Sequence, residues 1–294
     1  MGNDLQKISK VAAGQGHPGK NRVALVFGLL ALVLVLALPV LAPADLPAPA
    51  SDPRLGKVLE ELHYQVDVWV WQDAVRAKLL FREVGSSRYR AELDGRSQGL
   101  LSMLTGNWRG ALSTEMEYSQ GKLQPLVHRE ISYKSGKKRV MEYRFDYTQK
   151  KVELWKQEGD KPMAKRWEGA LTGSMYDPLT FFYNRRLTGA GIGEKGGESL
   201  KFQSIPYPKP DEITLRVGEQ TDEGRKIMVE LGNRLFKDEC SQVYAYLDAD
   251  GVPTKAWTQV MKFGNVDIKL LPGGKRLNKA DMTKAKDQAQ ACRN

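Results

Sequence analysis

Few residues of this chain have the types and spacing that catalysis or metal binding requires. Beyond residue 42 there are two histidines, His63 and His128, and they fall on separate predicted strands among polar neighbours. We interpret each as a solvated strand residue rather than a metal ligand or a general base. The run at residues 248–251, Asp-Ala-Asp-Gly, begins like a calcium-binding loop, but Gln259 stands where the twelfth-position glutamate would be. A β-turn is therefore the better interpretation of this run.

Other chemical motifs are missing or lie in the wrong context. Residues 191–196 have the spacing G-x-G-x-x-G, but they follow a predicted helix and open none. A dinucleotide site needs a strand before this motif and a helix after it, so we interpret the segment as a flexible loop. The sequence contains neither H-E-x-x-H nor C-x-x-C, and a standard zinc site is not expected. We predict a protein that is not an enzyme and that uses no metal and no cofactor.

A long apolar segment near the N-terminus predicts export from the cytoplasm. Residues 23–42 are apolar except for Gly28 and Pro39. A run of about 20 apolar residues can cross a bilayer as a helix. The basic segment ahead of it, residues 1–22, is then expected to stay in the cytoplasm. Residues 45–294 would lie on the periplasmic side of a bacterial envelope.

The apolar segment is either an anchor in the inner membrane or a cleaved signal peptide. Ala42-Pro43-Ala44 is a candidate A-x-A cleavage site, which would release a chain that begins at Asp45. A leader of this length exceeds the usual ~15–30 residues, which slightly favours the anchor. Residues 43–56 are rich in proline and alanine and predict an extended linker.

The chain has two cysteines, Cys240 and Cys292. Export would place both in an oxidising compartment, where a disulfide between them is one alternative. Two unrelated thiols are the other alternative, because spacing along the chain does not show that two cysteines lie close together.

The region from residue 57 to residue 274 is dominated by alternation of apolar and polar residues, which is typical of strands with one buried face. The clearest predicted apolar sets are Val75/Ala77/Leu79/Phe81, Tyr89/Ala91/Leu93, Met141/Tyr143/Phe145/Tyr147, Val243/Ala245/Leu247 and Val266/Ile268/Leu270, and Trp257 is placed in the apolar set of a further strand. At least ten such strands with short turns predict a mainly β domain. We expect an antiparallel curved sheet that forms a closed or half-open β-barrel, with a sandwich as the alternative.

Residues 177–187 break this alternation and predict one short helix. Asp177 is a suitable N-cap, and Pro178 suits the first helical position. Arg185 and Arg186 fall in the last turn, where positive charge is favourable to the helix dipole. The apolar face of this helix would cover an open end or groove of the sheet, or would simply complete the core.

Two tryptophans, Trp69 and Trp71, fall on the otherwise polar face of the first strand. They would form a patch that faces sugar or lipid, or they would pack under a loop.

Three stretches resemble a family of bacterial exported proteins, the domain-of-unknown-function family 3108. They are SQGLLSML at 97–104, YRFDYTQKKV at 143–152 and YDPLTFFYNRR at 176–186, and the turn at 248–253 fits as well. The likeness spans about residues 62–271. It implies an exported, β-rich, partly open barrel without known enzyme activity, and by looser analogy the curved-sheet carriers of lipoprotein acyl chains.

The net charge of +10 lies mainly near the two ends of the chain, with +3 in residues 1–22 and +4 in residues 275–294. The remaining +3 is too little for a basic binding face, so nucleic acid is not expected as a partner. We interpret residues 275–294 as a solvated basic tail.

Two hypotheses of function follow. The first is a non-enzymatic protein that binds a lipid or other apolar ligand in the curved sheet beneath the helix. The candidate ligand-binding residues are Leu179, Phe182, Tyr183, Tyr143 and Phe145. The second is an envelope assembly or scaffold protein that acts through protein–protein contacts, with partners that the sequence does not identify. In both, the inner membrane is contacted through the N-terminal helix.

Overall fold

The computed structural model describes residues 56–171, 175–187, 196–205, 211–231, 242–260, 264–283 and residue 285. Within these residues fifteen strands form one sheet, and the helices are few and short. The prediction of a mainly β domain is confirmed.

The elements follow the chain in a simple order. They are β1 (Lys57–Val68), β2 (Trp71–Gly85), β3 (Arg88–Ser97), α2 (Gly99–Leu104), β4 (Arg109–Ser119), β5 (Lys122–Lys134), β6 (Lys137–Asp146), β7 (Lys151–Glu158), β8 (Ala164–Ala170), β9 (Met175–Tyr176), α3 (Pro178–Leu187), β10 (Ser199–Ser204), β11 (Asp211–Thr221), β12 (Gly224–Leu231), β13 (Gln242–Leu247), β14 (Pro253–Val260) and β15 (Gly264–Leu277).

The sheet consists of two antiparallel meanders joined at their middle. Its order is β8-β7-β6-β5-β4-β3-β2-β1-β15-β14-β13-β12-β11-β10-β9, so β1 pairs with β2 on one side and with β15 on the other. Every pairing is antiparallel except that of β9 with β10. The order ends at β8 and β9, and no ladder joins these two strands in the described part of the chain. The half-open form is therefore confirmed, and the closed barrel is wrong.

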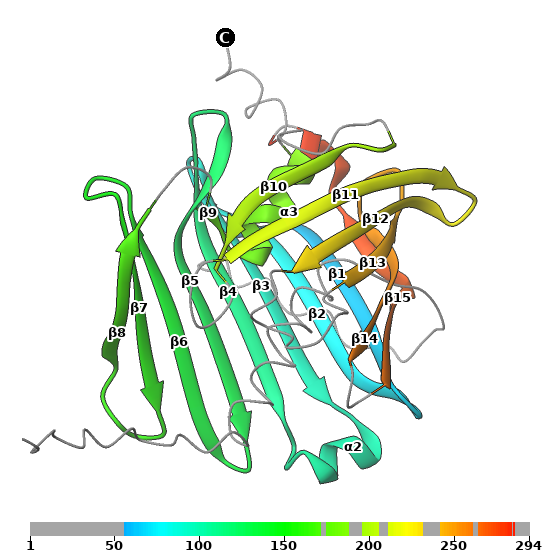
Figure 1. The fold of residues 1–294 in the computed structure, drawn as a ribbon, viewed down its shortest axis with the longest axis horizontal. Helices are drawn as coiled ribbons and strands as arrows, with labels where there is room; N and C mark the ends of the chain where they lie inside the picture. The colour runs from blue at the N-terminus through cyan, green and yellow to red at the C-terminus, as the bar shows by residue number, and fades with distance from the viewer. Residues whose placement is uncertain are drawn as a thin grey trace, which may run out of the picture.

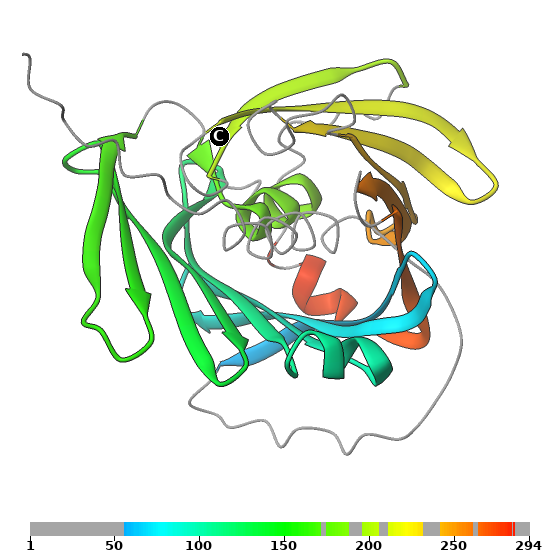
Figure 2. The same ribbon diagram turned by 60° about the horizontal axis from the view of Figure 1, so that its bottom comes forward.

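The sheet curves strongly and encloses α3. Figure 1 shows the strands side by side, with α2 at one end of them. In Figure 2 the two meanders wrap around α3, while β7 and β8 diverge from β10. The concave face is thus filled largely by this helix.

The predicted alternation is confirmed in most of the clearest sets, but Tyr147 lies beyond the end of β6 and is exposed. Val75, Ala77, Leu79 and Phe81 are all buried, as are the three-residue apolar sets of β3, β13 and β15.

The face of β14 was predicted wrongly. Its buried residues include Ala256 and Thr258, whereas Trp257 is only partly buried and stacks on Tyr244 at 5.4 Å between ring centroids. The Nζ atoms of Lys226 and Lys255 lie 6.0 and 5.9 Å from the Trp257 ring centroid. Because lysine stems and cation–π contacts shelter this indole outside the core, its apolar character misleads a prediction of the face.

The apolar side chains form two clusters. The larger one contains residues of β1–β5, α3 and β10–β15. The second, which we name the seam cluster, consists of Met141, Tyr143, Phe145, Val152, Leu154, Met175 and Ile205. Its members come from β6 and β7 on one side and from β9 and the residue after β10 on the other, so it lies between the two edges of the sheet.

Several features predicted from the sequence do not fall among the described residues. The predicted membrane helix at 23–42, nearly all of the linker at 43–56, and both cysteines, Cys240 and Cys292, lie outside the described residues. No helix within the described part is long and apolar enough to cross a membrane.

The predicted boundary of the C-terminal tail at residue 275 needs correction. β15 runs to Leu277, and residues 279–283 are helical. Met282 and Ala285 are buried because they lie one helical turn apart and face the core. This part of the tail belongs to the fold, in the concave face beside α3 (Figure 2).

Candidate functional site

The polar side chains with unusual environments gather around α3, and they begin at its N-terminus. Asp177 is fully buried and precedes the first helical residue. Its Oδ1 accepts hydrogen bonds from the backbone N–H of Leu179 at 3.0 Å and of Thr180 at 3.2 Å, and its Oδ2 accepts from the Thr180 hydroxyl. The predicted N-cap is confirmed, and it satisfies helix donors that burial would otherwise leave without partners.

The interpretation of His128 as a solvated residue is wrong. Its side chain is 1% exposed, and its Nδ1 lies 3.3 Å from Oδ1 of Asp177. Its Nε2 lies 3.7 Å from Oε1 of Glu130. His63 is half-buried as expected of a strand residue near the surface, with its Nε2 2.6 Å from Oε1 of Glu61.

The hydrogen bonds around His128 define which atoms carry protons. The Thr114 hydroxyl lies 2.6 Å from Asp177 Oδ1 and 2.8 Å from His128 Nδ1. A carboxylate only accepts, so the hydroxyl hydrogen points to Asp177 and Nδ1–H of His128 donates to Thr114. In a nucleophilic triad the hydroxyl instead donates to the imidazole. The arrangement is therefore the reverse of an activated nucleophile.

The charges of His128 and Asp177 stabilise each other. Burial by itself lowers the pKa of His128, but the carboxylates of Asp177 and Glu130 outweigh it and raise the pKa to about 9. Burial likewise acts to raise the pKa of Asp177, and the imidazolium together with the Thr114 and Thr180 hydroxyls lowers it below its ordinary value. The pair is an internal ion pair at neutral pH.

The middle of α3 is bonded to the backbone of β5. The Asn184 side chain donates from Nδ2 to the Leu123 carbonyl at 2.8 Å and accepts from the Leu123 N–H at 2.7 Å. The Asn184 amide thus pairs with the backbone N–H and carbonyl of Leu123 in the way that a neighbouring strand would.

The five predicted ligand-binding residues do not line one site. Leu179, Phe182 and Tyr183 belong to the larger core, and the Tyr183 ring stacks on Phe81 at 3.9 Å between centroids. Tyr143 and Phe145 belong to the seam cluster. All five are at most 7% exposed, so the helix completes a core rather than covering an open groove.

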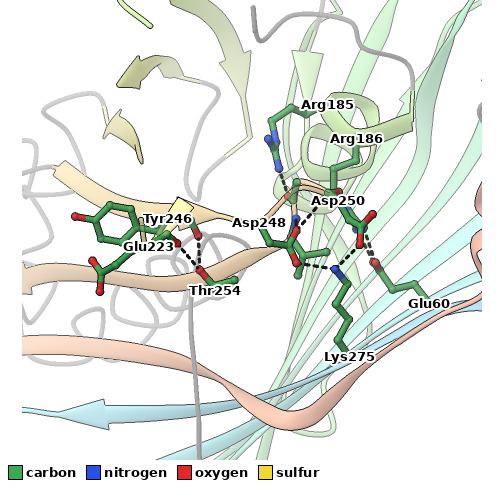
Figure 3. A network of polar contacts seen from close by, with 11 residues as sticks. Glu60, Arg185, Arg186, Glu223, Tyr246, Asp248, Asp250, Thr254 and Lys275 are labelled. Atoms are coloured by element: carbon green, nitrogen blue, oxygen red, sulfur yellow. Dashed lines mark hydrogen bonds and ion pairs between the residues drawn. The ribbon is translucent and has the colours of Figure 1, made fainter. Parts of the chain in front are cut away.

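The last turn of α3 is held by a second buried ion pair. Arg186 donates from Nη1 and Nη2 to the two carboxylate oxygens of Glu60, both at 2.6 Å (Figure 3). Tyr183 donates its hydroxyl to the same carboxylate at 2.9 Å. Burial acts to lower the pKa of Arg186, and the Glu60 carboxylate reverses this and raises it.

Arg185 lies beside this pair and has a different partner. It donates to the Gly251 carbonyl and makes no ion pair with a carboxylate of the described residues (Figure 3). Burial, and then the like charge of Arg186, lower the pKa of Arg185 to about 9. Both arginines therefore also hold the turn at residues 248–251, since Arg186 Nε donates to the Asp250 carbonyl at 3.1 Å.

The turn at residues 248–251 is a β-turn, as predicted. The Gly251 N–H donates to the Asp248 carbonyl at 2.9 Å. The carboxylates of Asp248 and Asp250 each accept a hydrogen bond from Lys275 Nζ at 2.6 Å (Figure 3). Within the described residues no group of three or more His, Cys, Asp or Glu side chains could hold a metal ion. These carboxylates are occupied by a lysine.

One motif that we did not identify from the sequence is G-x-S-x-G at residues 95–99, between β3 and α2. Ser97 is buried and donates from Oγ to the Trp108 carbonyl at 3.0 Å, while the Thr105 hydroxyl donates to Ser97 Oγ at 3.2 Å. In hydrolases that carry this motif, an imidazole activates the serine. Both described histidines have other partners, so Ser97 stabilises the turn into α2.

Comparison with known proteins identifies a family but no characterised relative. A family model described as "Protein of unknown function (DUF3108)" matches residues 63–267. The search of curated proteins gives no match.

Two solved structures are similar at low identity. A β-barrel-like protein of the domain of unknown function DUF1849 from Brucella abortus is 9% identical with a TM-score of 0.44, over 73% of this chain and 96% of that chain. A DUF1089 family protein from Pseudomonas aeruginosa is 11% identical with a TM-score of 0.30, over 72% of this chain and 92% of that chain. The architecture given above follows from the strand order of this chain itself.

Proposed function

The chain belongs to the DUF3108 family of proteins of unknown function, and we propose that it is a non-enzymatic binding protein for an apolar ligand, such as a lipid acyl chain, that enters at the seam cluster. The observation that carries the proposal is that apolar side chains, rather than a backbone ladder, fill the space between the two edges of a curved sheet.

The seam differs energetically from the rest of the sheet. Opening the sheet elsewhere would break ladders of backbone hydrogen bonds, whose unpaired groups are costly when buried. Between β8 and β9 no such ladder exists in the described residues. When an acyl chain enters there, the side chains of the seam cluster exchange apolar contacts with one another for apolar contacts with the acyl chain. Its entry therefore costs little free energy.

The helix itself is a poor place for a ligand. Displacing α3 would separate Glu60 from Arg186 and His128 from Asp177, which are buried ion pairs. Separating a buried pair costs several kcal/mol, about 3–5 when one partner is removed. We therefore assign Tyr143 and Phe145 to the proposed ligand contact, and Leu179, Phe182 and Tyr183 to the fixed core behind it.

The proposed place of action is the periplasmic side of a bacterial inner membrane. The apolar residues 23–42 and the basic residues 1–22 support this orientation. A membrane is also the natural source of an acyl chain.

Photocrosslinking of the full chain tests the proposal. Incubation with a palmitic acid that carries a diazirine, followed by irradiation and peptide mapping, is expected to give saturable adducts on β6, β7 and residues 175–176 and 205. The absence of saturable adducts, or adducts confined to other parts of the chain, would overturn it.

Two matched variants sharpen this experiment. Phe145 and Phe181 are both 7% exposed, but only Phe145 belongs to the seam cluster. We expect Phe145→Ala to weaken adduct formation at the seam by roughly fivefold, as for the loss of about 1 kcal/mol of contact. Phe181→Ala removes an equivalent ring from the larger core and is expected to leave the seam adducts unchanged.

A further inference from the structure

Exposed apolar side chains are concentrated at one end of the sheet. Of the eight large apolar residues that are exposed in the described part of the chain, six lie at this end: Trp69, Val70, Leu100, Met103, Leu104 and Tyr133. We name this set the rim. Five of the six are between 60% and 76% exposed, so they contribute little to the core.

The strand register places the rim residues on three neighbouring connections. Trp69 and Val70 form the turn between β1 and β2. α2 follows β3, whose last residue Ser97 pairs with Val75 near the start of β2. Tyr133 lies at the end of β5, beside the turn to β6. Since β1 to β6 are consecutive in the sheet, these connections form one continuous edge (Figure 1).

Two of these connections are packed tightly against each other. The Ser135 N–H donates to the Gly106 carbonyl at 3.1 Å. Gly106 has a φ of +68°, and a Cβ there would come within 2.3 Å of Ser135 Oγ. The loop after α2 therefore needs glycine at this position, and the lysines of the next turn are held close to the helix.

The rim is basic as well as apolar. Lys134, Lys137 and Lys138 are all exposed on the β5–β6 turn, and residues 131–138 contain no acidic residue. By contrast, Arg96 and Arg109 nearby both contact Asp94. The three lysines have no carboxylate partner among the ion pairs of the described residues, so they present a net positive charge beside the apolar side chains.

We propose that the rim docks this domain on the surface of a bilayer with anionic head groups. Trp69, Leu100, Met103 and Leu104 would enter the interfacial layer, where tryptophan is favoured, and the lysines would lie at the level of the phosphates. This charge decides between a membrane and a protein partner. Tryptophan and methionine are enriched in protein–protein interfaces, but lysine is depleted there, whereas anionic lipid attracts it.

The docking is independent of ligand binding at the seam. The rim residues are on the connections of β1 to β6, and none of them belongs to the seam cluster. Either property can therefore fail without the other.

A fluorophore at two matched positions tests the proposal in the full chain. Val84 is also an exposed apolar residue, but it lies at the opposite end of β2 from Trp69 and Val70. Met103→Cys and Val84→Cys are each labelled with an environment-sensitive dye, with Cys240 and Cys292 replaced by serine. The protein is reconstituted into phosphatidylcholine vesicles with and without phosphatidylglycerol, and nitroxide-bearing lipids serve as quenchers.

We expect quenching of the dye at position 103 in vesicles that contain phosphatidylglycerol, and none at position 84. Replacing Lys134, Lys137 and Lys138 together by glutamine should remove most of this quenching, and so should high salt, because the attraction to head groups is screened. Equal quenching at both positions would overturn the proposal. So would a dye shift at 103 that depends on protein concentration and not on lipid, since it would indicate a second copy or another protein as the occupant.

A second measurement keeps the native cysteines. Brominated lipids quench nearby tryptophans, and Trp69→Phe should remove a quenchable part of the intrinsic fluorescence in anionic vesicles. Trp155→Phe, on β7, is the matched control and should leave that part in place. If Trp69→Phe leaves the quenching in anionic vesicles unchanged, that result would also contradict docking through the rim.

Discussion

The Glu60 carboxylate and the Arg186 guanidinium form a bidentate ion pair between the first strand and the last turn of α3, across 126 residues of chain, with both N–O distances at 2.6 Å. Both side chains are almost completely buried, at 0% and 3% exposure. Together with the His128–Asp177 pair at the other end of α3, this contact fixes the helix across the concave face.

Removal of either member of this pair is expected to destabilise the fold strongly. Glu60→Met should lower the free energy of unfolding by about 3–5 kcal/mol, because it leaves the guanidinium buried without its partner. The free energy of unfolding of the double variant Glu60→Met/Arg186→Met should fall by much less than the sum of the falls in the two single variants. Urea unfolding of the four proteins gives the coupling energy, and additive losses would contradict a paired buried charge.

The His128–Asp177 pair predicts a loss of stability at alkaline pH. The pKa of His128 is about 9 in the fold and about 6.5 in an unfolded chain. A raised pKa stabilises the fold fully below pH ~6.5, and this contribution is lost as the pH rises through about 9. The lowered pKa of Asp177 stabilises the fold at pH values above the ordinary pKa of an aspartate. This contribution is lost as the pH falls through the lowered pKa.

Unfolding measured by urea at several pH values between 6 and 9.5 checks this. In the His128→Asn variant the decline across this range should be reduced. His63→Asn is the control, because His63 is half-buried near the surface beside Glu61, and it should retain the decline of the parent protein. An unchanged slope in His128→Asn would show that another group titrates.

Asn184→Leu is expected to lower the free energy of unfolding by about 2–4 kcal/mol. The substitution keeps a similar volume but leaves the N–H and the carbonyl of Leu123 buried without their partners. Gln157→Leu, a change of a partly buried amide on β7, should cost much less. Chemical denaturation of both variants gives the comparison, and equal losses would show that the amide of Asn184 has no special role.

The N-terminal segment is expected to remain on the mature protein. Peptide mapping by mass spectrometry of the protein extracted from membranes should recover residues 23–42 still joined to residues 43–56. The reason is the length of the apolar segment, which exceeds that of an ordinary signal peptide. A species that begins at Asp45 would show that the segment is cleaved.

The sequence was sufficient for much of the fold, because one face of nearly every strand is buried and the period of two is visible in the residues. The helix at residues 177–187 and the turn at 248–251 were also predictable, since each begins with an aspartate that accepts local hydrogen bonds. These features depend on residues within a few positions of one another.

The burial of His128 could not be read from the alternation, because a β-bulge intervenes. The pairing of β4 with β5 shifts between Glu115 and Met116, so that Met116 pairs with Pro125 and Glu115 with Val127. Beyond the extra residue of β5, the side chains that would have faced solvent face the core, and the reverse. His128 therefore points inward, where unbroken alternation would point it to solvent. Its partner Asp177 is distant in sequence, and no local pattern indicates the pair.

The sequence contains an indication of the Glu60–Arg186 pair that we did not use. Glu60 has the same parity on β1 as Leu62 and Tyr64, which are core residues. Arg186 recurs at helical spacing with Phe182 and Tyr183. Two opposite charges, each at a position where the pattern requires an apolar residue, indicate that they are paired in the core.

The pairing of β1 with β15 also sets the order in which the domain can assemble. β1 is made first and can pair with β2 at once, but its other edge has no partner until residues 264–277 have been synthesised. The contacts of highest sequence separation are therefore made at the centre of the sheet, which predicts slow folding in a single late step. Until then the free edge of β1 is open to other strands, so a chain that stalls before residue 264 should aggregate or depend on a chaperone.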